Sequence, residues 1–163
     1  MGSKQEFRAF YEREHATTRR VLGAFPVEQA HFRPHERSNT AQSLAWTFVA
    51  EERMLLLALQ GKPVLGSGVG MNPPESWDAI LAELDRVHDE VLAALDAMPG
   101  AEIAGTVRFF VAPKQMGDLP ARDFAYFMIH DQIHHRGQMS VYLRMAGGKV
   151  PSIYGPSADE PWT

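Results

Sequence analysis

Apolar side chains recur every three or four residues along four segments of the chain, a spacing that predicts four amphipathic helices. These segments cover residues 3–24, 39–60, 75–98 and 120–146. The third has the cleanest periodicity, with one face formed by Trp77, Ile80, Leu84, Val87, Val91, Leu95 and Met98. The second is apolar on nearly all sides, which predicts a central helix or one at a subunit interface.

Residues with strong positional preferences mark the ends of the predicted helices. Asn39 can cap the second helix, with Gln42 three residues later in the position of a capping box. The segment 61–74 is rich in glycine and proline, and as a loop it is long enough to run from one end of a bundle to the other. Pro120 suits the first turn of the last helix.

The predicted fold is all-α: a four-helix bundle with long crossover loops, formed by a single domain over residues 1–163. The stretch 106–111 is β-branched and aromatic, so one short extended strand pair could precede the last helix. The sequence contains no internal repeat.

Composition narrows the classes of partner and chemistry. The 163 residues include 16 basic and 20 acidic side chains, with no dense basic stripe, so nucleic acid is not an expected partner. The chain has no cysteine, which excludes thiolate nucleophiles and thiolate metal ligands. No apolar run approaches the roughly 20 residues needed to span a bilayer, so no membrane partner is predicted and a cytoplasmic protein is expected.

Two histidines four residues apart, His130 and His134, are the strongest candidates for chemistry. On a helix they share one face, and Phe127 and Val141 extend the same stripe. These apolar ends predict that both imidazoles face the inside of the bundle, where they could offer two nitrogens to a divalent metal. The alternative is a pair of histidines at the edge of the core, hydrogen-bonded to neighbouring helices.

Asp131 and His135 each follow one of these histidines by one position, about 100° around the helix. They are therefore expected to face a neighbouring helix, a subunit partner or solvent. Asp131 could also orient one of the two imidazoles from outside the metal site.

The segments 130–138 (HDQIHHRGQ), 142–144 and 147–160 resemble the C-terminal signature of the DinB-like family, and 44–46 and 50–51 resemble its second helix. The resemblance implies a four-helix bundle, often a homodimer, that holds zinc or nickel through three histidines. One of these ligands comes from the second helix and two come from the last.

By this resemblance His130 and His134 are the two ligands of the last helix, and Thr47 stands where the second helix should supply the third. A threonine hydroxyl is a poor neutral ligand for zinc or nickel, so a weakened or absent metal site is expected. Glu51, one turn beyond Thr47, could complete the site or form an ordinary internal salt bridge. We rank the weak or absent site above one completed by Glu51.

The resemblance implies a metal-dependent enzyme acting on a small molecule, either a hydrolase or a transferase that uses a low-molecular-weight thiol as cosubstrate. Trp46, Arg136 and Tyr142 are candidate substrate-binding residues, although Arg136 could equally lock the last helix through a salt bridge. The alternative function is a metal-free stress-response bundle that binds a small molecule or acts through a dimer surface. The sequence identifies neither a catalytic residue nor a substrate.

Overall fold

The structure, a computed structural model, describes residues 3–70 and 73–163 as four long helices and one antiparallel strand pair. The helices are α1 (Lys4–Gly23), α2 (Ala41–Leu59), α3 (Trp77–Ala97) and α4 (Ala121–Met145). The strands β1 (Thr106–Ala112) and β2 (Gln115–Pro120) form a hairpin between α3 and α4, and a short 3₁₀ turn η1 (Val27–Gln29) follows α1. The mostly helical chain and the strand pair before the last helix are both as predicted.

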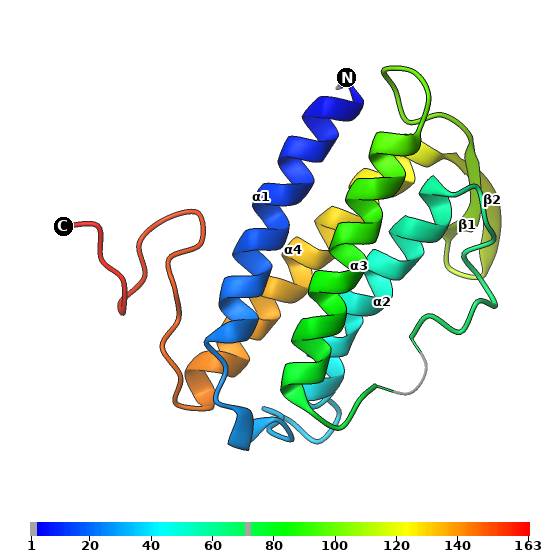
Figure 1. Cartoon of the computed structure of the whole chain (residues 1–163). Coiled ribbons are helices and arrows are strands. Elements are labelled where there is room, and N and C mark those ends of the chain that lie inside the picture. The colour runs from blue at the N-terminus through cyan, green and yellow to red at the C-terminus, as the bar shows by residue number, and fades with distance from the viewer. Residues whose placement is uncertain (1–2, 71–72) are drawn as a thin grey trace.

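The four helices run alongside one another, and α2 packs against both α3 and α4 (Figure 1). Helix α1 covers α3 and α4 from the other side. The hairpin lies at the end of the helices where the chain begins, and the segment after α4 runs outside α1 (Figure 1). None of the described helices has an apolar stretch long enough to cross a membrane.

The start of α2 lies one residue beyond the predicted cap. The Thr40 side chain, rather than that of Asn39, accepts a hydrogen bond from the backbone N–H of Ser43. Gln42 does not complete a capping box. Its buried amide instead donates to the backbone oxygen of Pro74 at 2.8 Å, which ties the start of α2 to the segment before α3.

A layer of buried polar side chains separates two clusters of apolar ones. One cluster contains Phe7 and Phe124, and the other contains Trp77 and Leu143. Between them, α1, α2 and α4 carry the following buried polar residues: Glu14, His15, Thr18, Glu51, Glu52, Gln132 and Arg136. Burying polar and charged groups is costly unless they find partners, so the contacts of each of these residues decide whether it stabilises the fold.

Candidate metal centre

Helix α4 directs His130 and His134 outward. Both side chains are exposed, and Phe127 and Val141 of the same stripe are 45% and 55% exposed. On this surface, the Gln138 side-chain amide donates to His134 Nε2 at 2.8 Å. The prediction that the two histidines face the inside of the bundle is therefore wrong, and their assignment as metal ligands stays a prediction.

The prediction that His130 and His134 face the interior fails because the interior face of α4 itself contains polar residues. Its buried side chains are Ala121, Phe124, Ala125, Met128, Ile129, Gln132, Arg136, Met139, Tyr142 and Leu143. Gln132 and Arg136 interrupt the apolar pattern in the middle of this face, so the sequence favoured the stripe through His130 and His134, which lies on nearly the opposite side of the helix. The correct interior stripe brings Asp131 and His135 to its edge in place of His130 and His134.

Glu51, Asp131 and His135 converge where α2 faces α4. His135 Nδ1 lies 2.7 Å from Glu51 Oε1, and the ligand atoms of all three residues lie within 4.8 Å of one another. Asp131 and His135 are one helical turn apart, and the Phe48 ring packs edge-on against His135 at a centroid distance of 6.3 Å. The site therefore combines two carboxylates and one imidazole, a set of oxygen and nitrogen donors that divalent transition metals accept.

The polar atoms of this site are buried but not satisfied. The Glu51 side chain is 3% exposed and that of His135 is 21% exposed. Glu51, His135 and Asp131 are close enough to share a proton, although no aligned hydrogen bond to either Glu51 oxygen or to His135 Nδ1 is present among the described residues. Donors held about 2.1 Å from a common ion lie about 3.0–3.4 Å apart, so this pair would have to separate by a few tenths of an ångström to hold one cation.

The electrostatics of the pair also favour a cation. Burial raises the pKa of Glu51 to about 7, an effect that His135 offsets in part and Asp131 increases. Glu51 in turn raises the pKa of His135. The metal-free pair therefore holds a proton near neutral pH, and a divalent cation would displace that proton on binding.

Glu51 points towards α4, as the hypothesis that it completes the metal site requires. The residue that it contacts there is His135, and not His130 or His134. Thr47, one turn earlier, donates from its hydroxyl to the backbone oxygen of Ser43 at 3.2 Å. It lines a cavity of about 240 Å³ formed with Trp46 and Gly70, and none of the described residues that line this cavity belongs to α4. Thr47 thus lies beside the loop that follows α2, away from the group around His135.

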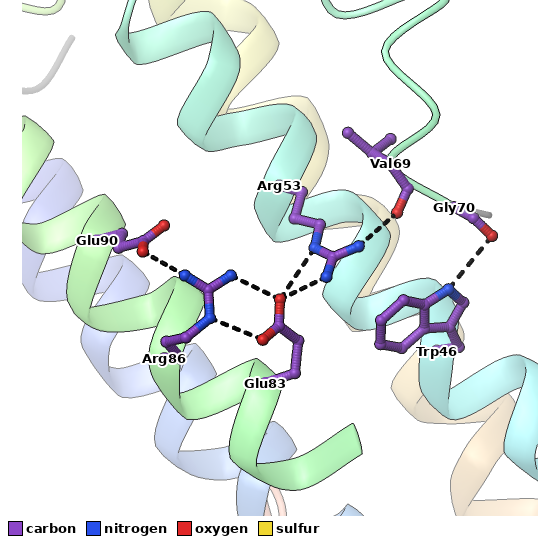
Figure 2. Close-up of polar contacts among 7 residues, drawn as sticks. All are labelled: Trp46, Arg53, Val69, Gly70, Glu83, Arg86 and Glu90. Carbon is purple, nitrogen blue, oxygen red and sulfur yellow. Dashed lines mark hydrogen bonds and ion pairs between the residues drawn. The ribbon is translucent and has the colours of Figure 1, made fainter. Parts of the chain in front are cut away.

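Trp46 helps to hold the loop that follows α2. Its indole N–H donates to the backbone oxygen of Gly70 at 3.2 Å, and the Arg53 guanidinium lies 4.8 Å from the ring centroid. Arg53 also donates to the Val69 backbone oxygen and to Glu83 of α3 (Figure 2). The Trp46 side chain is only 6% exposed, so these contacts describe a structural role, and its predicted contact with substrate stays a prediction.

Arg136 forms the salt bridge that was the alternative to substrate binding. It is 1% exposed, and its Nη2 donates to Glu14 of α1 at 2.7 Å. The Tyr154 hydroxyl donates to the same carboxylate at 2.6 Å, so the chain after α4 joins this network. Tyr142 is also buried, and its hydroxyl donates to the backbone oxygen of Asn39 at 3.0 Å. A role in substrate binding stays a prediction for both residues.

Comparisons with known proteins identify the family and the fold that this chain resembles. The sequence profile of the DinB superfamily matches residues 11–139. A DinB-like protein from Bacillus cereus ATCC 10987 has the same fold, with a TM-score of 0.77 and 24% identity over 93% of this chain and 98% of its own. The DinB-like protein YjoA from Bacillus subtilis gives a TM-score of 0.67 and 13% identity over 88% and 93% of the two chains.

A local match in sequence adds one relative. The uncharacterized protein YrdA of Bacillus subtilis strain 168 is 50% identical over 42 residues, which are 26% of this chain and 25% of YrdA. The match therefore spans about a quarter of that relative.

Proposed function

The chain belongs to the DinB superfamily, and from this membership we propose that it is a metal-dependent enzyme whose divalent cation is held by Glu51, Asp131 and His135. We also propose that the four helices form the four-helix bundle of this family as a single domain. The observation that carries the proposal is the buried carboxylate of Glu51, which faces His135 with both of its oxygens unsatisfied among the described residues.

The donor positions support this assignment. The resemblance implies two ligands one turn apart on the last helix and one on the second helix. Asp131 and His135 keep that spacing on α4, shifted by one residue from the exposed pair His130 and His134, and Glu51 supplies the donor of α2. The proposed centre therefore replaces three histidines by one histidine and two carboxylates.

This change of donors affects which ion is preferred. Zinc and nickel, the ions implied by the resemblance, accept both imidazole and carboxylate ligands. Two carboxylates also suit a harder ion such as manganese, which makes manganese the main competitor. Three protein ligands leave at least one coordination position for water or substrate, as in catalytic zinc sites.

The proposed reaction is hydrolysis of a small molecule or transfer of a low-molecular-weight thiol. A cation bound here would lower the pKa of a coordinated water or thiol and so supply a nucleophile near neutral pH. Since the chain has no cysteine, any thiol must come from a cosubstrate. Glu51 closes the inner side of the site, while Asp131 and His135 are partly exposed and mark the side from which a substrate would enter.

Metal analysis of matched variants tests this proposal. Protein produced without a histidine tag should retain a divalent cation through dialysis, and Glu51→Gln and His135→Ala should each lose it. His130→Ala and His134→Ala are the matched controls, since they remove exposed histidines of the same helix. The proposal would be overturned if the controls lost the cation and the two site variants kept it.

A metal-free module that acts as a homodimer is the second candidate. It is favoured by exposed apolar side chains along α4, where Phe127, Val141 and Met145 are 45%, 55% and 55% exposed. Exposed apolar side chains on one face of a helix can mark a site of association, and here the exposed His130 and His134 lie between them. A Val141→Asp variant that changes a dimer into a monomer, in a protein that binds no metal, would favour this function over the enzyme.

A further inference from the structure

A second group of metal-ligating side chains lies around the residue that follows Glu51. Its members are His15 of α1, Glu52 of α2 and His88 of α3, whose ligand atoms all lie within 4.8 Å of one another. Consecutive residues of a helix project about 100° apart, so Glu51 meets α4 while Glu52 meets α1 and α3. This group shares no residue with the centre proposed above.

The group is closely packed. His15 Nδ1 lies 2.9 Å from Glu52 Oε1, and the His15 and His88 rings are stacked at a centroid distance of 3.6 Å. The Tyr11 ring lies beside His88 at 4.8 Å. Asp85 approaches His15 Nε2 at 3.7 Å from the solvent side and is itself paired with Arg19.

Unsatisfied atoms remain in this group. Glu52 has a relative exposure of 0%, yet its Oε2 has no hydrogen-bond partner within the described part of the chain. His88 Nδ1 is likewise buried without such a partner, and the buried Tyr11 hydroxyl, which lies beside the Glu52 carboxylate, has no aligned hydrogen bond among the described residues. A buried donor or acceptor without a partner is costly, and more so when it is charged, so a ligand that satisfied several of them would be favoured.

We propose that His15, Glu52 and His88 bind a second divalent cation, of the zinc class, on the side of α2 that faces α1 and α3. Two imidazoles and one carboxylate are a donor set that zinc takes in proteins. Burial lowers the pKa of His88 to about 4, so its ring is neutral at physiological pH and keeps the lone pair that a cation needs.

Binding requires one local rearrangement. Lone pairs of imidazole nitrogens lie in the ring plane, and the two rings are within 17° of parallel, so they do not aim at a common point. One ring must turn out of the stack. His88 is only half-buried whereas His15 is 8% exposed, so we infer that His88 turns.

The cation would act as a structural cross-link. Its ligands come from three helices, and the carboxylate at its centre is fully buried. Binding would therefore pin α1 and α3 to α2, whereas the centre around His135 joins α2 to α4. A cation that binds only the folded chain raises the melting temperature as its concentration rises.

The experiment counts bound metal in variants of the full chain. Tag-free protein is stripped with a chelator and titrated with Zn²⁺ by calorimetry, with elemental analysis after gel filtration. We expect two equivalents for the wild type. Glu52→Gln and His88→Phe should each remove one, and His88→Phe keeps an aromatic ring in the stack, so it remains informative if Glu52→Gln fails to fold.

Matched variants separate this inference from the proposed function. His31→Ala removes an exposed loop histidine and should leave two equivalents. Glu51→Gln should remove one equivalent and leave the one that depends on His88. The inference is overturned if His88→Phe binds as much Zn²⁺ as the wild type. If Glu51→Gln changes nothing while His88→Phe loses one equivalent, the inference stands and the proposed function falls.

Discussion

The carboxylate of Glu51 and the imidazole of His135 lie 2.7 Å apart across the contact between α2 and α4, without the alignment of a hydrogen bond. Both belong to a polar layer that divides the apolar interior into two clusters. Replacing a buried ion pair by apolar side chains of similar volume is often neutral or stabilising, so such a pair is weak evidence of a role in stability. The proposed cation site depends on this relationship.

Removing the charge of Glu51 should have opposite effects on metal binding and on the stability of the metal-free protein. Glu51→Gln should weaken divalent-metal binding by about 100-fold, or about 3 kcal/mol. In the chelator-treated protein at pH 8 the same change should raise the free energy of unfolding by about 1–2 kcal/mol, because it removes an unsatisfied buried carboxylate. Calorimetric titration and urea unfolding measure the two quantities. If the metal affinity and the free energy of unfolding of the metal-free protein both fell, Glu51 would act only by stabilising the fold.

The ion pair between Glu14 and Arg136 should make stability depend on pH. Burial opposes ionisation of Glu14, but hydrogen bonds from Tyr154 and Arg136 hold its pKa below the ordinary value. This contribution is present above the unfolded pKa of about 4.5 and is lost as pH falls through the lower folded pKa. Glu14→Gln should cost about 3 kcal/mol at pH 7, and urea unfolding should give a smaller difference from the wild type at pH 3. An equal cost at both pH values would contradict this account.

The Tyr154 hydroxyl should anchor the chain that follows α4. Tyr154→Phe removes its hydrogen bond to Glu14 and should lower the free energy of unfolding by about 1 kcal/mol. The segment 147–163 should then be cleaved faster in limited proteolysis, while the helices stay intact. Cleavage at the wild-type rate would mean that the other contacts of the segment, such as Arg144 with Asp159, are sufficient.

The loop after α2 should depend more on Arg53 than on Arg86, although both pair with Glu83. Arg53 also donates to the Val69 backbone oxygen and covers the Trp46 ring, and it is less exposed than Arg86, at 28% against 53% (Figure 2). Arg53→Ala should cost about 1–2 kcal/mol and Arg86→Ala less than about 0.5 kcal/mol. Chemical denaturation of both variants measures how far each lowers the free energy of unfolding. Equal losses would show that the ion pair with Glu83 is the only contact of Arg53 that contributes to stability.

The helices could be predicted from the sequence because their apolar faces are regular. Every residue of the stripe from Trp77 to Leu95 is buried, and Met98 at its end is partly buried. The strand pair was also predicted, since the composition of 106–111 favours extended backbone.

The candidate site could be predicted only in part. Asp131 and His135 have the one-turn spacing predicted for His130 and His134, but Gln132 and Arg136 are buried, and their polarity led to an interior face predicted on nearly the opposite side of α4. The group of His15, Glu52 and His88 could not be predicted, because its members come from three helices whose mutual rotation no local pattern encodes.

Anomalous X-ray scattering at the zinc edge, from crystals of the tag-free protein grown with Zn²⁺, tests the central claim most directly. The account predicts a peak within coordination distance of Glu51, Asp131 and His135. A peak between His130 and His134 on the outer face of α4, with none beside Glu51, would contradict it.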